Sequence, residues 1–299
     1  MNECIVRTDI FDYGPTYQAY RDGSDDEKNA IFHNHLFLKS LQDQGFFSNG
    51  NQLTLVADIG CGEGDTIINY LKGIQFEGGI DIRAFDANPE YVGQSNDSGD
   101  DSSITTIDEN APVVRNFSIA KQSQIIPLRN YQIKCGNMTQ SDLTSLLYTK
   151  QELKQSKNRF DLVYISHALY YARRELGAVG ITKVLDNVFT NLLSENGIAI
   201  LFHSSIKPDT VGAICAYHLS LIQDIVPTDE ENKMIATDRL ISSSCDELGL
   251  TYFKIPYKSG LYFSNNFKDY IDIFKNINRY HEIRNNNQAL QDLYRLIFV

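Results

Sequence analysis

The chain has 299 residues, of which 42% are hydrophobic and 22% charged, a balance typical of a folded globular protein and not of a disordered or fibrous one. Its net charge of −11 repels phosphate backbones and anionic lipids, so we expect no nucleic acid and no membrane as a partner, and favour a cationic or neutral small molecule. The five cysteines are widely spread and form no C-x-x-C pair, which indicates a reducing, cytoplasmic location and no metal centre.

The N-terminal part, residues 1–48, is predicted to be a lid segment rich in aromatic side chains. It has no apolar signal region, and no stretch of the chain reaches the roughly 18 apolar residues that a membrane span needs. Ser24 and Glu27 have the spacing of a helix-capping box, which predicts a helix from residue 24 to about residue 44, with Gly45 just beyond its end.

Five short apolar runs follow, and each precedes a stretch that can form a helix. This alternation predicts a doubly wound α/β fold whose mostly parallel sheet is covered on both faces. The expected core spans residues 49–205, with a mobile polar insertion at about 94–110, and residues 206–299 are expected to add further helices. The predicted strands are 53–59, 82–87, 131–136, 160–166 and 197–203, and the later helices are 208–224, 237–248 and 267–282.

The clearest motif lies directly after the first predicted strand, where Gly60, Gly62 and Gly64 alternate with other residues. Glycines let the backbone approach a ligand closely, and the start of the next helix offers free N–H groups. The dinucleotide fingerprint requires the spacing G-x-G-x-x-G. The shorter G-x-G-x-G spacing here, with acidic Asp58 ahead of the first glycine, favours a methyltransferase over a dehydrogenase.

A second motif ends the next predicted strand, where Asp86 precedes Ala87, Asn88 and Pro89. In a doubly wound sheet these two strands are neighbours, so a carboxylate at this point can accept hydrogen bonds from both ribose hydroxyls of a nucleoside. The alternative is that Asp86 only shapes the turn before Pro89.

Together these motifs resemble those of the class I S-adenosylmethionine-dependent methyltransferases, over roughly residues 50–205. The first motif of that family is similar to Val56–Asp65, the second to Phe85–Glu90 and the fourth to Phe160–Val163, and Leu193–Gly197 is similar to the turn before strand five. The resemblance implies a Rossmann-like, seven-stranded-type sheet that binds S-adenosyl-L-methionine. The residues it implies for the cofactor are Asp58, Gly60, Cys61, Gly62, Glu63, Gly64, Asp86, Ala87, Asn88, Asn137 and Met138 near the adenine, and Ser166.

Within that superfamily the chain most resembles histamine N-methyltransferase and its relatives. Three stretches carry the resemblance: Tyr17 to Glu27, Ser166 to Tyr171, and Thr237 to Leu250. His167 stands where that family has a glutamine that contacts the substrate. Glu27, with Asp26 as its rival, matches a glutamate that holds the substrate, and the family's C-terminal strand has no clear counterpart here.

His167 is the candidate catalytic base, because an imidazole can accept a proton near neutral pH. The competing interpretation is a histidine that only ties down a loop. His203, at the end of the fifth predicted strand, is a second candidate. An aromatic wall of Tyr17, Tyr20, Tyr170 and Tyr171 could surround a flat or cationic substrate, so the predicted substrate-binding residues are Tyr17, Tyr20, Glu27, His167, Tyr170, Tyr171 and His203.

These observations favour methylation of the nitrogen of a small amine or azole. Methylation of a hydroxyl or carboxylate oxygen is the first alternative. A module that binds S-adenosylmethionine without catalysis is the second, since an intact glycine loop is compatible with it.

Overall fold

The computed structural model describes residues 25–48, 50–93, 108–140, 142–148, 159–203 and 237–257. Tyr17, Tyr20 and Ser24, most of the predicted insertion, and the predicted helices at 208–224 and 267–282 lie outside these ranges. The chain forms two compact units. The larger one comprises Ile31–Ser204 and Ala236–Lys254, and of the described residues only 25–30 and 255–257 belong to the other.

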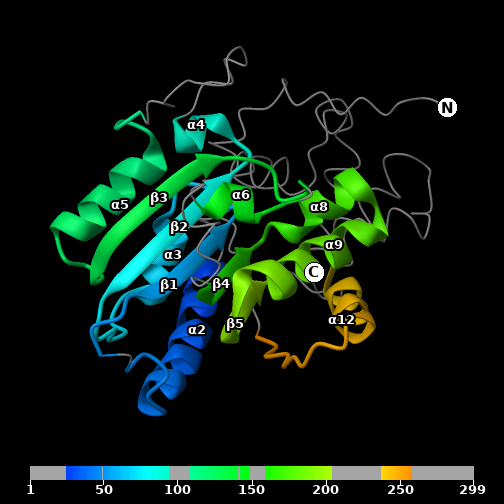
Figure 1. Ribbon diagram of the computed structural model, residues 1–299, viewed down its shortest axis with the longest axis horizontal. Helices are drawn as coiled ribbons and strands as arrows, with labels where there is room; N and C mark the ends of the chain where they lie inside the picture. The colour runs from blue at the N-terminus through cyan, green and yellow to red at the C-terminus, as the bar shows by residue number, and fades with distance from the viewer. Residues whose placement is uncertain are drawn as a thin grey trace, which may run out of the picture. The chain divides into compact units, whose positions relative to one another are not determined.

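A sheet of five parallel strands forms the centre of the larger unit, in the order β3-β2-β1-β4-β5 (Figure 1). This confirms the predicted α/β fold with a parallel sheet, and the described part of the chain shows five of the seven strands that the resemblance implied. The chain runs outward from β1 in one direction through β2 and β3 and in the other through β4 and β5. The strands are β1 Thr54–Ile59, β2 Ile80–Asp86, β3 Leu128–Cys135, β4 Phe160–Ser166 and β5 Leu193–Phe202.

Helices cover both faces of this sheet, because alternate residues of each central strand point to opposite sides. Ala57, Val163 and Ile165 pack in one apolar cluster with residues of α8, α9 and α12. On the opposite face Tyr164 stacks on Tyr70 of α3, with 5.6 Å between ring centroids. The helices are α2 Asp26–Asp43, α3 Asp65–Leu71, α4 Pro89–Val92, α5 Pro112–Gln122, α6 Thr144–Leu147, α8 Leu169–Leu176, α9 Ala178–Asn187, the π-helix η2 Val188–Leu192 and α12 Thr237–Glu247.

Helix α2 is tied to the sheet through Asn34, which is buried. Its amide nitrogen donates to the backbone carbonyl of Tyr70 over 2.8 Å, and its amide oxygen accepts from the Tyr164 hydroxyl over 3.1 Å. The bounds of α2, Asp26–Asp43, agree with those of the helix predicted at 24–44 to within two residues at each end. Across the described ranges, no helix is both long and apolar enough to cross a membrane.

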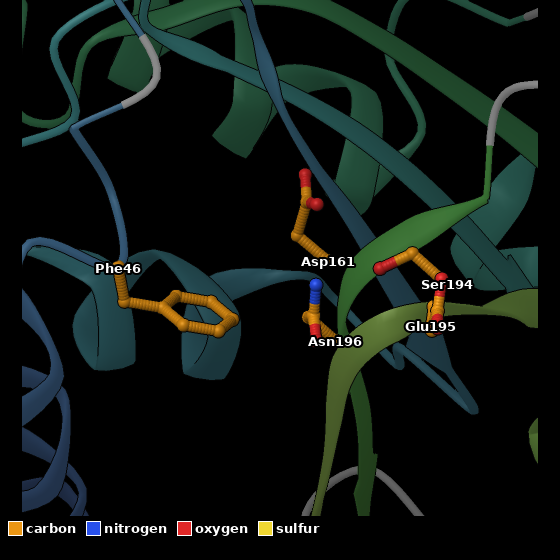
Figure 2. Close-up of a pocket in the computed structure, with 5 residues that line it drawn as sticks. All are labelled: Phe46, Asp161, Ser194, Glu195 and Asn196. Atoms are coloured by element: carbon orange, nitrogen blue, oxygen red, sulfur yellow. The ribbon is translucent and has the colours of Figure 1, made fainter.

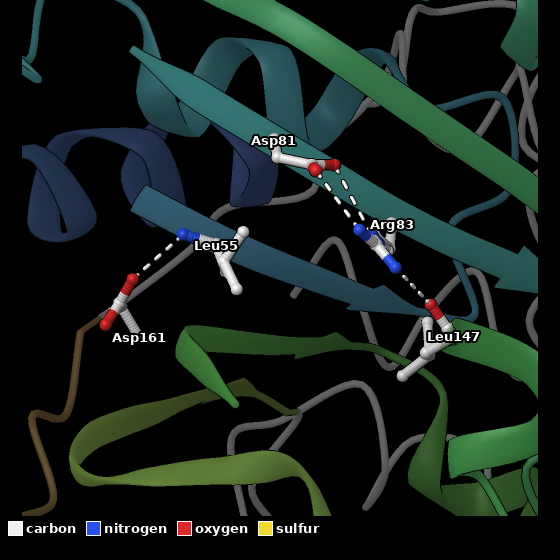
Figure 3. A network of polar contacts seen from close by, with 5 residues as sticks. All are labelled: Leu55, Asp81, Arg83, Leu147 and Asp161. Atoms are coloured by element: carbon white, nitrogen blue, oxygen red, sulfur yellow. Dashed lines mark hydrogen bonds and ion pairs between the residues drawn. The ribbon is translucent and has the colours of Figure 1, made fainter. Parts of the chain in front are cut away.

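Strand β2 begins two residues earlier than predicted because it carries a buried ion pair. Asp81 and Arg83 lie on the same face of the strand and are 7% and 8% exposed. The guanidinium contacts the carboxylate over 3.2 Å and donates to the carbonyl of Leu147 over 3.2 Å, as Figure 3 shows. Each charge compensates the other, so a strand that includes both can be fully buried.

Strand β5 begins at Leu193, where a turn was expected at Leu193–Gly197. Phe160 pairs with Leu193 and Leu162 pairs with Ile198, so residues 194–197 form an irregularity inside the strand. Gly197 is required there, since a β-carbon at this position would lie 2.6 Å from the carbonyl oxygen of Phe160. The prediction of a separate turn was wrong because the chain bulges without leaving the sheet.

Candidate functional site

The glycine motif forms the loop between β1 and α3 at the carboxyl edge of the sheet. Gly60, Gly62 and Gly64 have positive φ angles of 75°, 52° and 73°, a region that side chains disfavour. A β-carbon on Gly60 would lie 2.8 Å from that of Ala168, and one on Gly64 would lie 2.8 Å from a methyl of Val113. These two glycines therefore let other elements pack closely against the loop.

Gly62 differs from its neighbours, because a β-carbon added there would have no atom within 4 Å. Its backbone N–H donates to a carboxylate oxygen of Asp86 over 2.8 Å. The other Asp86 oxygen accepts the N–H of Asn88, also over 2.8 Å. The open side of the loop and the Asp86 carboxylate thus lie together at the ends of neighbouring strands, where the sequence placed them.

Burial raises the pKa of the Asp86 carboxyl, and the N–H donors of Asn88, Gly62 and Ala87 act in the opposite direction. The two carboxylate oxygens have four lone pairs together, and these three donors leave at least one of them available. Asp86 is therefore held in a fixed orientation and can still accept a hydrogen bond from a ligand hydroxyl.

Asp58 lies near the end of β1 and is 5% exposed. Its pKa is raised from 3.8 to about 8, first by burial and then by repulsion from Asp86 and Asp65. Three carboxyl groups therefore surround the glycine loop, and the most buried of them is largely protonated at neutral pH. An environment of this kind favours a ligand with a positive charge.

Other residues of the two motifs stabilise the loop. Cys61 is buried, and its backbone N–H donates to the carbonyl of Phe85 over 3.1 Å. Glu63 is exposed, and its carbonyl accepts from the Asn116 side chain of α5 over 2.9 Å. Asn88 caps α4 by accepting the N–H of Glu90, and Ala87 is exposed beside it. The side chain of Asn88 thus has a structural role that the sequence did not indicate.

Residues 136–140, after β3, lie against this loop. The N–H of Gly136 donates to the carbonyl of Asp86 over 2.9 Å. Met138 is buried, and its methyl lies 3.5 Å from where a β-carbon of Gly60 would be. The side-chain amide of Asn137 donates to both oxygens of Glu175 on α8, at 2.8 Å each. Glu175 was not predicted as a site residue, and nothing in the sequence pattern relates it to Asn137.

Ser166 is the last residue of β4, His167 follows it, and His203 follows the end of β5. The hydroxyls of Ser166 and Tyr70 are 3.4 Å apart, within hydrogen-bonding distance. His167 has a φ of 50°, uncommon for a side-chain-bearing residue, and its N–H donates to the carbonyl of Phe202 over 2.9 Å. The two imidazole rings are 6.4 Å apart between centroids.

Burial in the first place, and repulsion from His167 in the second, lower the pKa of His203 from 6.5 to about 3. His203 is therefore neutral at physiological pH and is a weak base. Of the two histidines that the sequence singled out, this leaves His167 as the better candidate for accepting a proton.

The other predicted substrate residues within the described ranges lie at the starts of α8 and α2. Tyr171 is half-buried at the start of α8, whereas the side chain of Tyr170 is outside the described set. Glu27 is half-buried in the first turn of α2, in the smaller unit, where neighbouring Asp26 accepts from the Tyr257 hydroxyl over 3.3 Å. Their assignment to a substrate pocket stays a prediction.

A hollow of about 440 Å³ lies at the opposite, amino edge of the sheet. It is lined by Phe46, Asp161, Ser194, Glu195 and Asn196 (Figure 2). Asp161, which the resemblance placed in the fourth motif, accepts the N–H of Leu55 over 2.9 Å and so joins β4 to the start of β1. This hollow is separate from the glycine loop, and the Asp161 carboxylate in its lining already has a structural partner.

The residues at the carboxyl edge fit an adenosyl cofactor with a cationic end. Gly62 leaves room for close approach, Asp86 offers two acceptor oxygens, and the carboxyl group of Asp58 lies close to those of Asp86 and Asp65, where a cationic ligand would favour its ionisation. Among the described residues, no group of three or more His, Cys, Asp or Glu side chains could hold a metal ion.

Comparison with protein-family models finds no match, and comparison with curated proteins finds none either. Solved structures do match. The plantazolicin methyltransferase BamL, in complex with a triazolic desmethylPZN analog and SAH, shares 13% identity at a TM-score of 0.38, with 94% of this chain and 82% of that one covered. An O-methyltransferase family protein from Burkholderia thailandensis shares 10% identity at 0.42, with 80% and 59% covered.

The CurJ carbon methyltransferase shares 15% identity at a TM-score of 0.47, with 85% of this chain and 56% of that one covered. The chain thus spans a little over half the length of the second and third of these proteins and most of the first.

Proposed function

We propose that this chain is an S-adenosylmethionine-dependent methyltransferase that acts on a small molecule. The observation that carries the proposal is the pairing of Asp86 with Gly62. A carboxylate fixed by two backbone N–H groups lies beside a loop whose central glycine faces open space. That pairing supports a ribose-bearing ligand, and the G-x-G-x-G spacing and the acidic surroundings favour one with a sulfonium group.

The cofactor, when bound, supplies an activated methyl group, so the protein's task is to align the acceptor and exclude water. Asp86 would hold the ribose hydroxyls, and the backbone of Gly60–Gly64 would lie against the amino-acid part. The loop at Gly136–Gln140 would flank the adenine. Asp58 would become ionised beside the cationic groups and stabilise them.

For the acceptor, the proposal is the nitrogen of a small amine or azole, with His167 as the base that takes its proton. His167 directly follows β4, and its backbone is fixed by the hydrogen bond that its N–H donates to the carbonyl of Phe202. Neutral His203 beside it would orient the substrate and not compete for the proton. Methylation of oxygen remains the second candidate, because a base in this position suits a hydroxyl as well.

Cofactor binding is tested by titrating S-adenosylhomocysteine into the protein by calorimetry. We expect Asp86→Ala to weaken binding by about 100-fold, because the hydrogen bonding of its carboxylate to ribose is lost. Asp246→Asn, an exposed carboxylate on α12, is the matched control and should bind as the wild type does. Equal affinities for the wild type and Asp86→Ala would overturn the assignment of this site.

Catalysis is tested by measuring S-adenosylhomocysteine release with panels of amines, azoles, phenols and carboxylic acids. Turnover confined to amines or azoles, and lowered about 100-fold or more in His167→Ala, is the expected result. Turnover confined to phenols or acids would favour the oxygen alternative. Tight cofactor binding with no turnover on any panel would favour a non-catalytic binding module.

A further inference from the structure

Glu175 receives hydrogen bonds from two residues of the loop after β3. The Asn137 amide nitrogen lies 2.8 Å from each carboxylate oxygen, and the Thr139 hydroxyl lies 2.5 Å from one of them. Glu175 is exposed on α8, 36 and 38 residues away in sequence. A single carboxylate thus joins α8 to this loop at the carboxyl edge of the sheet.

Glu175 and the backbone N–H of Thr139 together determine which way the Asn137 amide faces. An ionised carboxylate only accepts hydrogen bonds, so the amide must present its NH₂ group to Glu175. The amide oxygen then faces away and accepts the backbone N–H of Thr139 over 3.0 Å. That oxygen has a second lone pair, and it can accept one more hydrogen bond.

The loop that carries Asn137 belongs to the proposed cofactor site. The N–H of Gly136 donates a hydrogen bond to the carbonyl of Asp86, and the Met138 methyl packs against Gly60. The part of an adenosyl cofactor nearest to this loop would be its base, whose exocyclic amino group donates hydrogen bonds. A hypoxanthine base carries a carbonyl acceptor in the same place.

We propose that Glu175 is a specificity-determining residue: by fixing the Asn137 amide with its oxygen available, it makes the site select an adenine amino group over a hypoxanthine carbonyl. This inference rests on the proposed function, since it assumes that the cofactor's base lies at this loop. Glu175 itself does not contact the base and acts through Asn137.

The test compares the affinities of the full-length protein for S-adenosylhomocysteine and for its deaminated analogue, S-inosylhomocysteine, by calorimetry. The wild type should prefer the adenosyl form by about tenfold or more, because the inosyl form sets a carbonyl against the Asn137 oxygen. In Glu175→Gln the side-chain amide can donate as well as accept, so only the Thr139 N–H still holds the Asn137 oxygen in place, and the turned Asn137 amide becomes accessible when an inosyl carbonyl stabilises it. We expect the preference to fall to about threefold or less, with the inosyl form bound at least as well as before.

Two further variants separate this role from a structural one. Glu175→Asp keeps a group that only accepts, and it should retain most of the preference. Glu247→Gln, an exposed glutamate on α12, should leave both affinities unchanged.

If Glu175→Gln weakens both ligands by the same factor, Glu175 only braces the loop and the inference is wrong. A wild type that binds both ligands equally well also refutes it, while leaving the proposed cofactor site in place. Failure of the wild type to bind either ligand would overturn the proposed function and this inference with it.

Discussion

At the scale of single residues, the two glycines of the loop that differ in their surroundings give a direct test of what the loop does. Gly64 faces Val113 and Phe117, whereas Gly62 faces open space. Gly64→Ala should cost about 2–4 kcal/mol of unfolding free energy, from left-handed strain and overpacking together. Gly62→Ala should cost only about 1–2 kcal/mol, the strain alone, yet reduce affinity for S-adenosylhomocysteine more strongly.

Urea unfolding and calorimetry on the two variants measure both effects. The comparison is matched, because each variant adds one methyl group at a glycine with positive φ. If Gly62→Ala binds the ligand as tightly as the wild type does, the open side of the loop is not the ligand-binding side.

Asp58 gives a residue-scale prediction about pH. Its pKa is about 8 in the folded protein, against 3.8 in a solvent-exposed carboxyl. Between these values the folded state binds a proton that the unfolded state has released, so this group's contribution to stability is full below pH 4 and is lost as the pH rises to about 8. The loss is on the order of a few kcal/mol.

Asp58→Asn has no such proton to bind. The free energy of unfolding of the wild type should therefore fall, relative to that of Asp58→Asn, as the pH rises from 5 to 8. Urea denaturation at several pH values measures this difference. Parallel pH profiles for the two proteins would show that Asp58 is ionised in the folded state.

At the scale of elements, strand β2 depends on the pair Asp81 and Arg83. Arg83→Met removes the cation and leaves a carboxylate inside the sheet, which should cost about 3–5 kcal/mol of unfolding free energy. The double variant Asp81→Val/Arg83→Met should recover most of this loss, because two apolar side chains suit a buried strand. Lys39→Met, which breaks the exposed pair with Asp43, should cost less than about 1 kcal/mol.

Chemical denaturation of the three variants checks this order. A double variant no more stable than Arg83→Met alone would mean that the hydrogen bond to Leu147, and not charge compensation, is what β2 needs from Arg83.

A comparison of strands β4 and β2 illustrates how far the sequence predicts the elements. Strand β4 was predicted with its observed bounds, because FDLVYIS is a continuous apolar run apart from Asp161, whose carboxylate is satisfied by Leu55. The strand predicted at 82–87 includes Arg83 and leaves out Asp81, whereas β2 contains both. Only the three-dimensional pairing with Arg83 shows why a charge belongs there.

The site follows the same rule. The sequence predicts the positions of the glycine loop, Asp86 and His167 at strand ends, because each directly follows or ends an apolar run, and in a doubly wound sheet ligand-binding groups gather at such ends. Glu175 and Asn137 meet through tertiary structure alone, 38 residues apart, and no periodicity or spacing encodes that contact.

At the scale of the whole molecule, the net charge of −11 should affect how fast the cofactor arrives. S-adenosylmethionine carries a net charge of +1 and S-adenosylhomocysteine none, because only the former has a sulfonium. The protein's field attracts the cation, and salt screens that attraction. Raising the salt from about 0.02 M to about 0.2 M should therefore slow association of S-adenosylmethionine several-fold and leave that of S-adenosylhomocysteine nearly unchanged.

Stopped-flow measurements of tyrosine fluorescence can follow the association of both ligands, since the chain has 17 tyrosines and no tryptophan whose emission would dominate the signal. The two ligands share every group except the methyl and its charge, so S-adenosylhomocysteine serves as the control for any general effect of salt on the protein. An equal salt dependence for both ligands would mean that the acidic surface lies away from the entrance. In that case the local carboxyl groups, Asp58, Asp65 and Asp86, would have to account for any preference for a cation.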